Sequence, residues 1–215
     1  MTQTRVVIFA NGLLPDLEKA RLILRPDDFL LGADGGTHHI LALGRRPDLV
    51  IGDLDSLDPQ VHARLESQGV KIIRFPRDKD ATDLELAVQH ALSLQPPSVL
   101  IVAALGERLD QTIGNLALVS DAALSKFDIR MDDGVERAFF VRDQAELQGR
   151  LGDVVSLIPW GDAVTGVHTE GLKWALRGET LLPHKTRGLS NEMEGERAGV
   201  RIDSGVLLVT HRRLD

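Results

Sequence analysis

The sequence predicts an α/β fold, in which an N-terminal parallel-sheet α/β domain is followed by a C-terminal all-β sandwich domain. Short apolar runs alternate with amphipathic stretches of helical length in the first half, and this alternation is typical of parallel sheets. From about residue 127 the helical period is lost, and short apolar runs follow one another with turn residues between them. Such closely spaced runs are typical of a sandwich or small barrel. A length of 215 residues suffices for one large domain or two small ones.

The first half alternates apolar and amphipathic segments in a regular order. The apolar runs predict strands at Val6–Ala10, Phe29–Leu31, Leu49–Ile51, Ile72–Ile73 and Val99–Ala104. The amphipathic stretches predict helices at Leu17–Leu24, Thr37–Leu43, Pro59–Gln68, Thr82–Leu94 and Thr112–Leu124. Thr82 is placed to cap its helix, because Glu85 follows at the third position after it.

The second half contains short strands without long helical periods. The apolar runs predict these strands at Ala138–Val141, Val154–Ile158, Val164–Val167, Leu172–Leu176, Val200–Ile202 and Val206–Thr210. The period changes near Arg142–Gln148, which predicts one domain over residues 1–142 and a second over residues 143–215.

Composition excludes several classes of protein. The net charge of −7 argues against a general nucleic-acid binder, since these proteins usually carry a basic patch. No apolar run approaches the roughly 18 residues that a membrane span needs. Cysteine is absent, so disulfides and thiolate metal sites are excluded. With no visible secretory signal before the first predicted strand, we expect a cytoplasmic protein with no membrane or nucleic-acid partner.

Acidic residues follow the predicted strands. In Ile51-Gly52-Asp53-Leu54-Asp55-Ser56, Asp53 and Asp55 come directly after a strand, and residues two apart in extended backbone point to the same side. Carboxylate oxygens suit Mg²⁺, which often binds through carboxylates and substrate phosphates. Further acids in similar settings are Asp34, Asp80, Asp83 and Asp110. Because ligands bind beyond the carboxyl ends of parallel strands, these acids indicate metal-assisted phosphate chemistry.

Each acidic motif alone also fits a structural role. Asp34, followed by two glycines, fits a tight turn with an N-capping Asp, and Asp53 and Asp55 fit a polar turn before a helix. Asp80 and Asp83 fit the first turn of a helix. The occurrence of four such motifs, each at a strand-to-helix junction, favours a functional site.

Two further residues have both a structural and a functional interpretation. Arg108 can form an ordinary ion pair with Asp110, or it can hold a transferring phosphate group. Trp174 can be a core residue, or it can stack on a flat, cationic ring.

Together these motifs resemble the thiamine pyrophosphokinase family over nearly the whole chain. The matching segments are Ala33–Gly36, Pro47–Asp48, Ile51–Ser56, Asp78–Ala87, Gly106–Thr112, Thr169–Trp174 and Leu189–Glu192. The resemblance implies transfer of a pyrophosphoryl group from ATP to thiamine, with Mg²⁺, giving thiamine diphosphate and AMP. It also implies a homodimer whose active sites lie at the subunit interface.

The resemblance also implies roles for individual residues. Residues 1–142 would bind ATP and Mg²⁺, and residues 143–215 would bind thiamine and form the dimer. The implied metal and catalytic carboxylates are Asp53, Asp55 and Asp83, with Arg108 as a further catalytic residue. The implied nucleotide contacts are Asp34, Lys79, Arg108 and Asp110. The implied thiamine contacts are Trp174, Ser190 and Asn191.

Some features leave alternatives open. The hydroxyl proton would pass to Asp55 or Asp83. Many bacterial members of the family have Gly-Gly-Arg-x-Asp-His where this chain has Gly106 to Gln111, with Glu107 and Gln111 as the departures. A pyrophosphokinase acting on a hydroxymethylpterin-like alcohol would share the acids but would not need the segments around Trp174 and Ser190. A non-catalytic sensor of thiamine or nucleotide would be expected to lack at least one acid.

Overall fold

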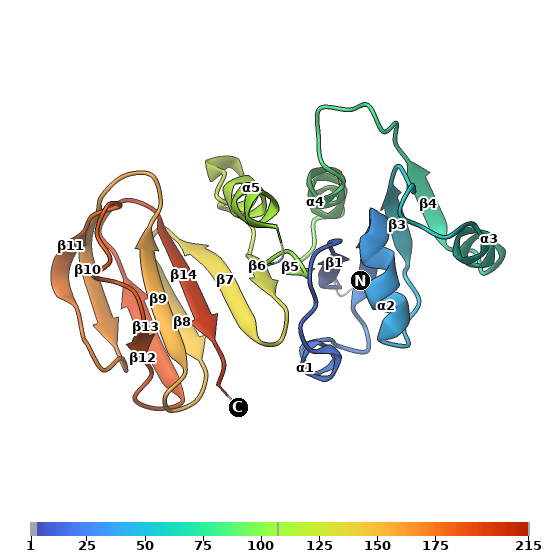
Figure 1. Ribbon diagram of the computed structural model, residues 1–215. Helices are drawn as coiled ribbons and strands as arrows, with labels where there is room; N and C mark the ends of the chain where they lie inside the picture. Colours follow the sequence, from blue (N-terminus) through green and yellow to red (C-terminus); the bar gives the residue numbers. More distant parts are fainter. Residues whose placement is uncertain (1–3, 107, 215) are drawn as a thin grey trace. The chain divides into compact units, whose positions relative to one another are not determined.

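The computed structural model describes residues 4–106 and 108–214, and its contacts divide the chain into two compact units (Figure 1). The first unit, residues 1–134, is a parallel α/β unit, and the second, residues 135–215, is an antiparallel sandwich. The predicted fold class is therefore confirmed. Among the described residues, no helix is long and apolar enough to cross a bilayer.

The first unit is built on a parallel sheet. Its strands are β1 (Val6–Phe9), β2 (Phe29–Ala33), β3 (Leu49–Gly52), β4 (Lys71–Arg74), β5 (Val99–Val102) and β6 (Ile129–Asp132). They lie in the order β6-β5-β1-β2-β3-β4, with each neighbouring pair parallel. The chain runs outward from β1 to β4 and then returns to β5 beside β1. The sheet therefore has a topological switch point between β1 and β5, where ligands of open α/β sheets usually bind.

Short polar side chains cap the starts of α1, α3 and α4 in the first unit. The helices are α1 (Leu17–Leu22), α2 (Thr37–Ala42), α3 (Pro59–Ser67), α4 (Asp83–Ser93) and α5 (Leu109–Val119), with 3₁₀ turns η1 (Asp34–Gly36) and η2 (Ala122–Leu124). Asp16 and Asp58 accept hydrogen bonds from backbone N–H groups in the first turns of α1 and α3. Thr82 accepts one from the N–H of Glu85, so its predicted capping role is confirmed.

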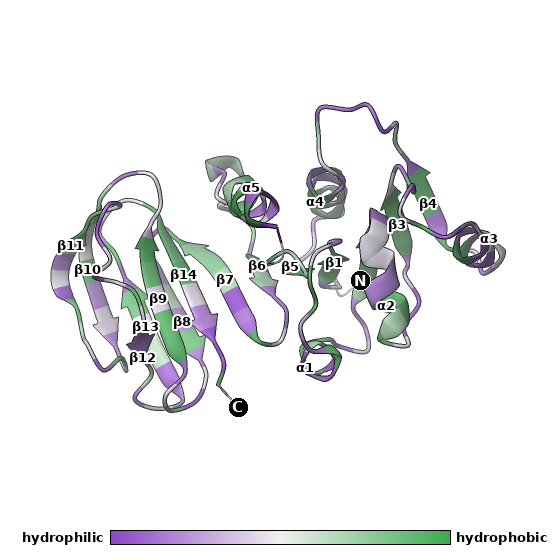
Figure 2. Ribbon diagram, viewed as in Figure 1, coloured by the Kyte–Doolittle hydropathy of each residue, from purple (hydrophilic) through white to green (hydrophobic). Residues whose placement is uncertain are grey.

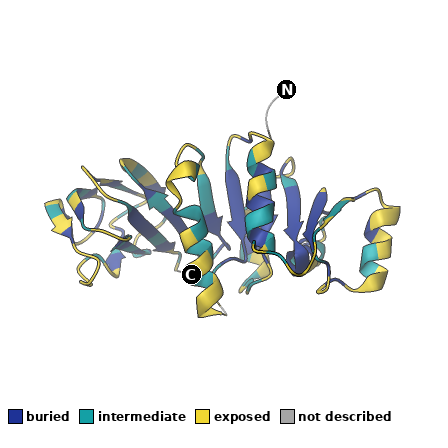
Figure 3. Ribbon diagram, turned by 90° about the horizontal axis from the view of Figure 1, so that it is seen from above, coloured by how far each residue is buried: buried dark blue, intermediate teal, exposed yellow. Residues whose placement is uncertain are grey.

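The central strands are apolar along their whole length because both faces of the sheet are covered. Every residue of β1 and β3 is buried, and Figure 2 colours both strands as hydrophobic. The helices expose their outer sides, as Figure 3 shows. This burial explains why the strands were recognisable from continuous apolar runs rather than from alternation.

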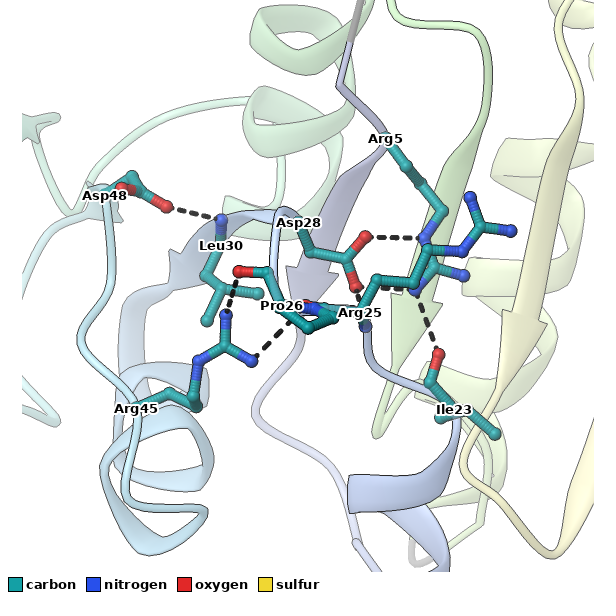
Figure 4. A network of polar contacts seen from close by, with 8 residues as sticks. All are labelled: Arg5, Ile23, Arg25, Pro26, Asp28, Leu30, Arg45 and Asp48. Atoms are coloured by element: carbon teal, nitrogen blue, oxygen red, sulfur yellow. Dashed lines mark hydrogen bonds and ion pairs between the residues drawn. The ribbon is translucent and has the colours of Figure 1, made fainter.

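Charged side chains form ion pairs and hydrogen bonds at the amino ends of β1, β2 and β3 (Figure 4). Arg5, which precedes β1, forms a two-pronged ion pair with Asp28, which precedes β2 and is 5% exposed. Asp48, which precedes β3, accepts a hydrogen bond of 2.8 Å from the N–H of Leu30. These contacts fix the strand order at one end of the sheet.

The second unit has two antiparallel sheets with a shared core. Its strands are β7 (Glu136–Val141), β8 (Gln144–Gln148), β9 (Val154–Pro159), β10 (Val164–Glu170), β11 (Arg177–Leu181), β12 (Asn191–Glu192), β13 (Arg197–Arg201) and β14 (Leu207–Arg212). Strands β12-β9-β14-β7 pair in one sheet and β11-β10-β13-β8 in the other. Val155 and Val209 from the first pack in one core with Val167 and Val200 from the second.

The prediction of one strand in the second unit, at Leu172–Leu176, is wrong. Leu172–Leu176 forms no strand, because the chain turns at Gly171, whose φ of +67° ends β10. Leu172 and Leu176 are nevertheless buried in the core, which accounts for the apolar signal.

Candidate functional site

Three carboxylates gather at the carboxyl ends of the parallel strands. Asp34 follows β2, Asp53 follows β3, and Asp83 is the first residue of α4. One oxygen from each lies within 4.8 Å of the others. We call Asp34, Asp53 and Asp83 the acid cluster.

Glycines allow the backbone to bring these acids together. A Cβ on Gly36 would clash with the carbonyl oxygen of Phe9, at the end of β1. A Cβ on Gly52 would lie 2.9 Å from the Cβ of Asp34. Only glycine permits such close backbone approach, so the two glycines hold the turn after β2 against β1 and β3.

Asp34 is not the N-cap that its turn suggested. Its side chain caps neither η1 nor α2, and it is only 6% exposed. Its Oδ1 is buried without a hydrogen-bond partner. A buried carboxylate oxygen without a partner is costly, and binding a cation would satisfy it. With only carboxylate oxygens as donors, the acid cluster fits a hard cation such as Mg²⁺.

Burial and hydrogen bonding set the electrostatics of the acid cluster, and like charges contribute less. Burial raises the pKa of the Asp83 carboxyl; Lys79 opposes this shift, and the negative charges of Asp34 and Asp53 add to it. The Lys79 ammonium lies 3.1 Å from Oδ1 of Asp83 and 3.7 Å from Oδ2 of Asp53. By contrast, the backbone N–H of Asp55 lowers the pKa of the Asp53 carboxyl. The carboxyls of Asp83 and Asp53 are thus shifted in opposite directions, and positive charge beside them favours their ionised forms.

The backbone from Asp53 to Asp55 is not extended as the sequence argument required. Leu54, between them, has a φ of +68°, so the backbone turns and Oδ1 of Asp53 accepts the N–H of Asp55. The Asp55 carboxylate instead accepts the Ser56 hydroxyl and lies 3.5 Å from Nε of Arg77. The geometric premise was therefore wrong, while the role of Asp55 in the reaction stays a prediction.

A cavity of about 530 Å³ contains the acid cluster. Its lining comes from the carboxyl ends of β1, β2, β3 and β5 and from the starts of α4 and α5. It includes Gln111, one of the departures from the family pattern, and also Asn11 and Asn115, which sequence reasoning did not single out. Asn11 lies two residues after the end of β1, so the rule that ligands bind at strand ends was a usable signal for it. Asn115 donates to the carbonyl oxygen of Ala104 at 2.9 Å and so fixes the loop after β5.

Arg108 and Asp110 lie at the start of α5, beside the cavity. The guanidinium donates to both oxygens of Asp110, at 3.2 and 2.6 Å, and Arg108 lines the cavity. The Arg108 guanidinium is also the main cause that holds the pKa of the Asp110 carboxyl below its usual value. Glu107, a departure from the family pattern, lies outside the described residues.

In the second unit, Trp174 is held by Asn191. The Asn191 side chain accepts the N–H of Trp174 at 3.0 Å and donates to its carbonyl oxygen at 2.9 Å. The amide of Asn191 is thus used to position Trp174. Ser190 adopts a φ of +57°, and its N–H donates to the hydroxyl of Ser156.

Trp174 is not a core residue. It is 53% exposed, which excludes the packing interpretation of this tryptophan. The Lys173 ammonium lies 4.7 Å from the indole centroid, so the ring already attracts a cation. An exposed indole held by hydrogen bonds can stack on a flat, positively charged ligand.

Comparisons with known proteins cover both units. A family model described as "Thiamin pyrophosphokinase, catalytic domain" matches residues 20–131, and one described as "Thiamin pyrophosphokinase, vitamin B1 binding domain" matches residues 142–207. A thiamine pyrophosphokinase of Bacillus subtilis is 27% identical over 181 residues, covering 83% of this chain and 85% of the relative. Thiamine pyrophosphokinase 1 of Arabidopsis thaliana is 29% identical over 201 residues, covering 82% and 75%.

The structural comparison supports the fold. The crystal structure of thiamine pyrophosphokinase from Bacillus subtilis superposes with a TM-score of 0.87 at 23% identity, covering 99% of this chain and 100% of that one.

Proposed function

Because the chain belongs to the thiamine pyrophosphokinase family, we propose that it transfers a pyrophosphoryl group from ATP to the hydroxyl of thiamine, giving thiamine diphosphate and AMP. The observation that carries this function is the acid cluster, which lies in a cavity at the switch point of a parallel sheet. Phosphate-transfer chemistry depends mainly on positioning and charge neutralisation, and this site supplies groups for both.

The carboxylates are proposed to hold the metal. Asp53 and Asp83, with Asp34 beside them, would bind Mg²⁺, and Asp55 stays in the proposed set from its place in the motif. Mg²⁺ bound there would neutralise charge on the ATP phosphates.

The reaction needs one proton acceptor on the protein. The hydroxyl oxygen of thiamine forms a bond to the β-phosphorus, and the bond from this phosphorus to the oxygen bridging to the α-phosphate breaks. AMP leaves with that electron pair, and the hydroxyl proton passes to Asp55 or Asp83. Asp83 belongs to the acid cluster and Asp55 does not, so their variants are expected to differ in metal affinity.

We propose that Asp34, Lys79, Arg108 and Asp110 contact the nucleotide. Asp34, Lys79 and Arg108 line the cavity, and Asp110 holds the Arg108 guanidinium. The planar fork of Arg suits two phosphate oxygens at once.

Arg108→Lys should weaken use of ATP. Lysine keeps the positive charge but cannot donate two parallel hydrogen bonds as the guanidinium does. Because a hydrogen bond to a charged group contributes substantially to binding, the KM for ATP should rise about tenfold. The KM for thiamine should not change. Arg130→Lys is a matched control, because Arg130 also pairs with an Asp two residues away, Asp128, and does not line the cavity. If Arg108→Lys changed only the KM for thiamine, the assignment of Arg108 to the nucleotide site would be contradicted.

We propose that Trp174, Ser190 and Asn191 form the thiamine site. Asn191 holds the Trp174 backbone, and the exposed indole offers a face for the thiazolium or the aminopyrimidine.

Trp174→Ala should raise the KM for thiamine about tenfold, the effect of roughly 1.4 kcal/mol from a lost cation–aromatic contact. The ATP KM and the thermal stability should change little, because the side chain is half exposed. Trp160→Ala is the control: Trp160 packs edge-on against Phe140 with centroids 5.3 Å apart, so its loss should lower stability and leave the thiamine KM unchanged. Parallel loss of stability and of both KM values in Trp174→Ala would contradict stacking.

The active site is proposed to be shared by two subunits of a homodimer. This proposal rests on the family, and on the separation of functions: every residue lining the acid-cluster cavity belongs to residues 1–142, and every proposed thiamine contact to residues 143–215. A dimer would then carry two sites, each completed by the other subunit.

Mixing two defective chains tests the shared site. Asp83→Asn and Trp174→Ala chains are mixed, allowed to exchange, and assayed far below the thiamine KM of the Trp174 variant. With statistical exchange, half of the dimers are mixed and half of their sites are intact, so activity should return to about a quarter of the normal value. No recovery, with exchange confirmed by mass, would mean that each site lies within one chain.

We further propose that the protein acts in the cytoplasm without nucleic-acid or membrane partners. The net charge of −7 and the lack of cysteine support this setting.

The alcohol substrate is tested by AMP release with thiamine and with hydroxymethylpterin. The held tryptophan favours thiamine, and the retained acids favour catalysis over sensing. We expect AMP with thiamine and little with the pterin. Equal or greater rates with the pterin would reassign the substrate, and binding without AMP would support a sensor.

A further inference from the structure

Within the described part of the chain, Lys79 places its ammonium against the acid cluster. It lies in the segment between β4 and α4, and its ammonium is 3.1 Å from Asp83 and 3.7 Å from Asp53. Its side chain is only 14% exposed, as is that of Asp53. The ammonium is thus held against two of the three acid-cluster carboxylates, in a place largely shielded from water.

The acid cluster needs this charge. Three carboxylates with oxygens within 4.8 Å repel one another, and Lys79 supplies one positive charge against them. Arg77, which also lines the cavity, is 85% exposed and pairs with Asp55 instead. Oδ1 of Asp34 and Oδ1 of Asp83 are both buried without a hydrogen-bond partner, so the ion pair with Lys79 leaves oxygens of the acid cluster unsatisfied. Among residues 4–106 and 108–214, the ion pairs with Lys79 therefore neutralise the acid cluster only in part.

A divalent cation and Lys79 would compete for the same oxygens. A metal bound to Asp53 and Asp83 would lie a few ångströms from the ammonium, where like charges repel strongly in a partly buried site. Lysine has a long, flexible stem, so its head group can move while its backbone stays in place.

We propose that Lys79 is the internal counter-ion of the acid cluster, and that an arriving metal displaces its ammonium toward the nucleotide phosphates. The second half of this statement rests on the proposed function. The displacement couples binding of the metal to binding of the nucleotide. When the metal binds, the Lys79 ammonium becomes available to the phosphates. When a phosphate binds that ammonium, the carboxylates become available to the metal. Such coupling is reciprocal in binding free energy.

The test measures Mn²⁺ affinity without nucleotide, by calorimetry or by electron paramagnetic resonance. Lys79→Met removes the competing charge, so Mn²⁺ should bind at least about fivefold more tightly, the lower end of usual coupling between linked events. Lys71→Met is the matched control, because Lys71 is exposed at the start of β4 and makes the same change in net charge. Its Mn²⁺ affinity should equal that of the unaltered protein. Unchanged or weaker Mn²⁺ binding in Lys79→Met would overturn the proposal.

Thermal unfolding in chelator and in saturating Mn²⁺ gives a second readout. Lys79→Met should unfold at a lower temperature than the unaltered protein in chelator, and Mn²⁺ should remove the difference. A variant that folds only with Mn²⁺ would also support the proposal. Loss of stability that Mn²⁺ does not restore, or no loss in chelator, would overturn it.

These readouts are separate from the proposed function. The function is judged by AMP formation in the unaltered protein, whereas the counter-ion role is judged by Mn²⁺ alone. Failure of AMP formation with the predicted Mn²⁺ difference would reject the enzyme and keep the counter-ion. AMP formation without that difference would keep the enzyme and leave Lys79 as a phosphate contact only.

Discussion

Asp53→Asn and Asp83→Asn should each lower turnover by about 100-fold or more, the scale for losing one strong transition-state contact. Asparagine keeps the size of the side chain and removes a charged oxygen ligand from the acid cluster. Mn²⁺ affinity should fall in parallel. Asp55→Asn should also lower turnover if Asp55 accepts the proton, but with Mn²⁺ affinity retained, since its carboxylate lies outside the acid cluster.

The control for these variants is Asp162→Asn, an exposed Asp in the second unit. It should behave like the unaltered protein in both assays. Near-normal turnover of Asp53→Asn and Asp83→Asn at saturating Mg²⁺ would remove the acid cluster from the reaction. Retained Mn²⁺ affinity in Asp83→Asn with lost turnover would instead assign Asp83 as the proton acceptor.

Gly36→Ala should destabilise the protein by roughly 3 kcal/mol, the upper range for forcing an extra carbon into packed structure. The added Cβ would meet the backbone carbonyl of Phe9, which cannot rotate away as a side chain can. Movement of this turn would also shift Asp34, so metal affinity should fall. Chemical denaturation gives the stability, and Mn²⁺ titration gives the second effect.

Gly114→Ala is the contrasting variant. Gly114 lies inside α5, and a Cβ there would meet no atom within 4 Å. Alanine favours helices over glycine by up to about 1 kcal/mol, so stability should stay the same or rise. If both variants destabilise equally, close approach at Gly36 is not the reason for its glycine.

Much of the first unit could be predicted because its strands are buried on both faces. The runs around Val7 and Val50 are apolar throughout, and Thr82 carries a local capping signal. The polar strands β8 and β11 were missed, since Gln144–Gln148 and Arg177–Leu181 expose most of their residues. A run of alternating or polar residues gives little signal when one side faces water.

The sequence predicted that acidic residues gather at the carboxyl ends of the strands. It did not predict which of these residues form the acid cluster. Asp34, Asp53 and Asp83 come from three separate segments, so they meet because β2 and β3 are neighbours, because the glycines allow close approach, and because α4 contacts both strands. Asp55 is excluded by the conformation of Leu54, which residue spacing does not encode. The orientation of Trp174 likewise depends on Asn191, seventeen residues away.

The most direct test of the central claim identifies both products of one reaction. Purified protein is incubated with ATP, Mg²⁺ and thiamine. The nucleotide and thiamine products are then separated, and mass spectrometry identifies and quantifies them. Attack on the β-phosphorus predicts AMP and thiamine diphosphate in equal amounts, with both products absent when chelator is added. ADP with thiamine monophosphate, or AMP formed equally fast without thiamine, would contradict pyrophosphoryl transfer at this site.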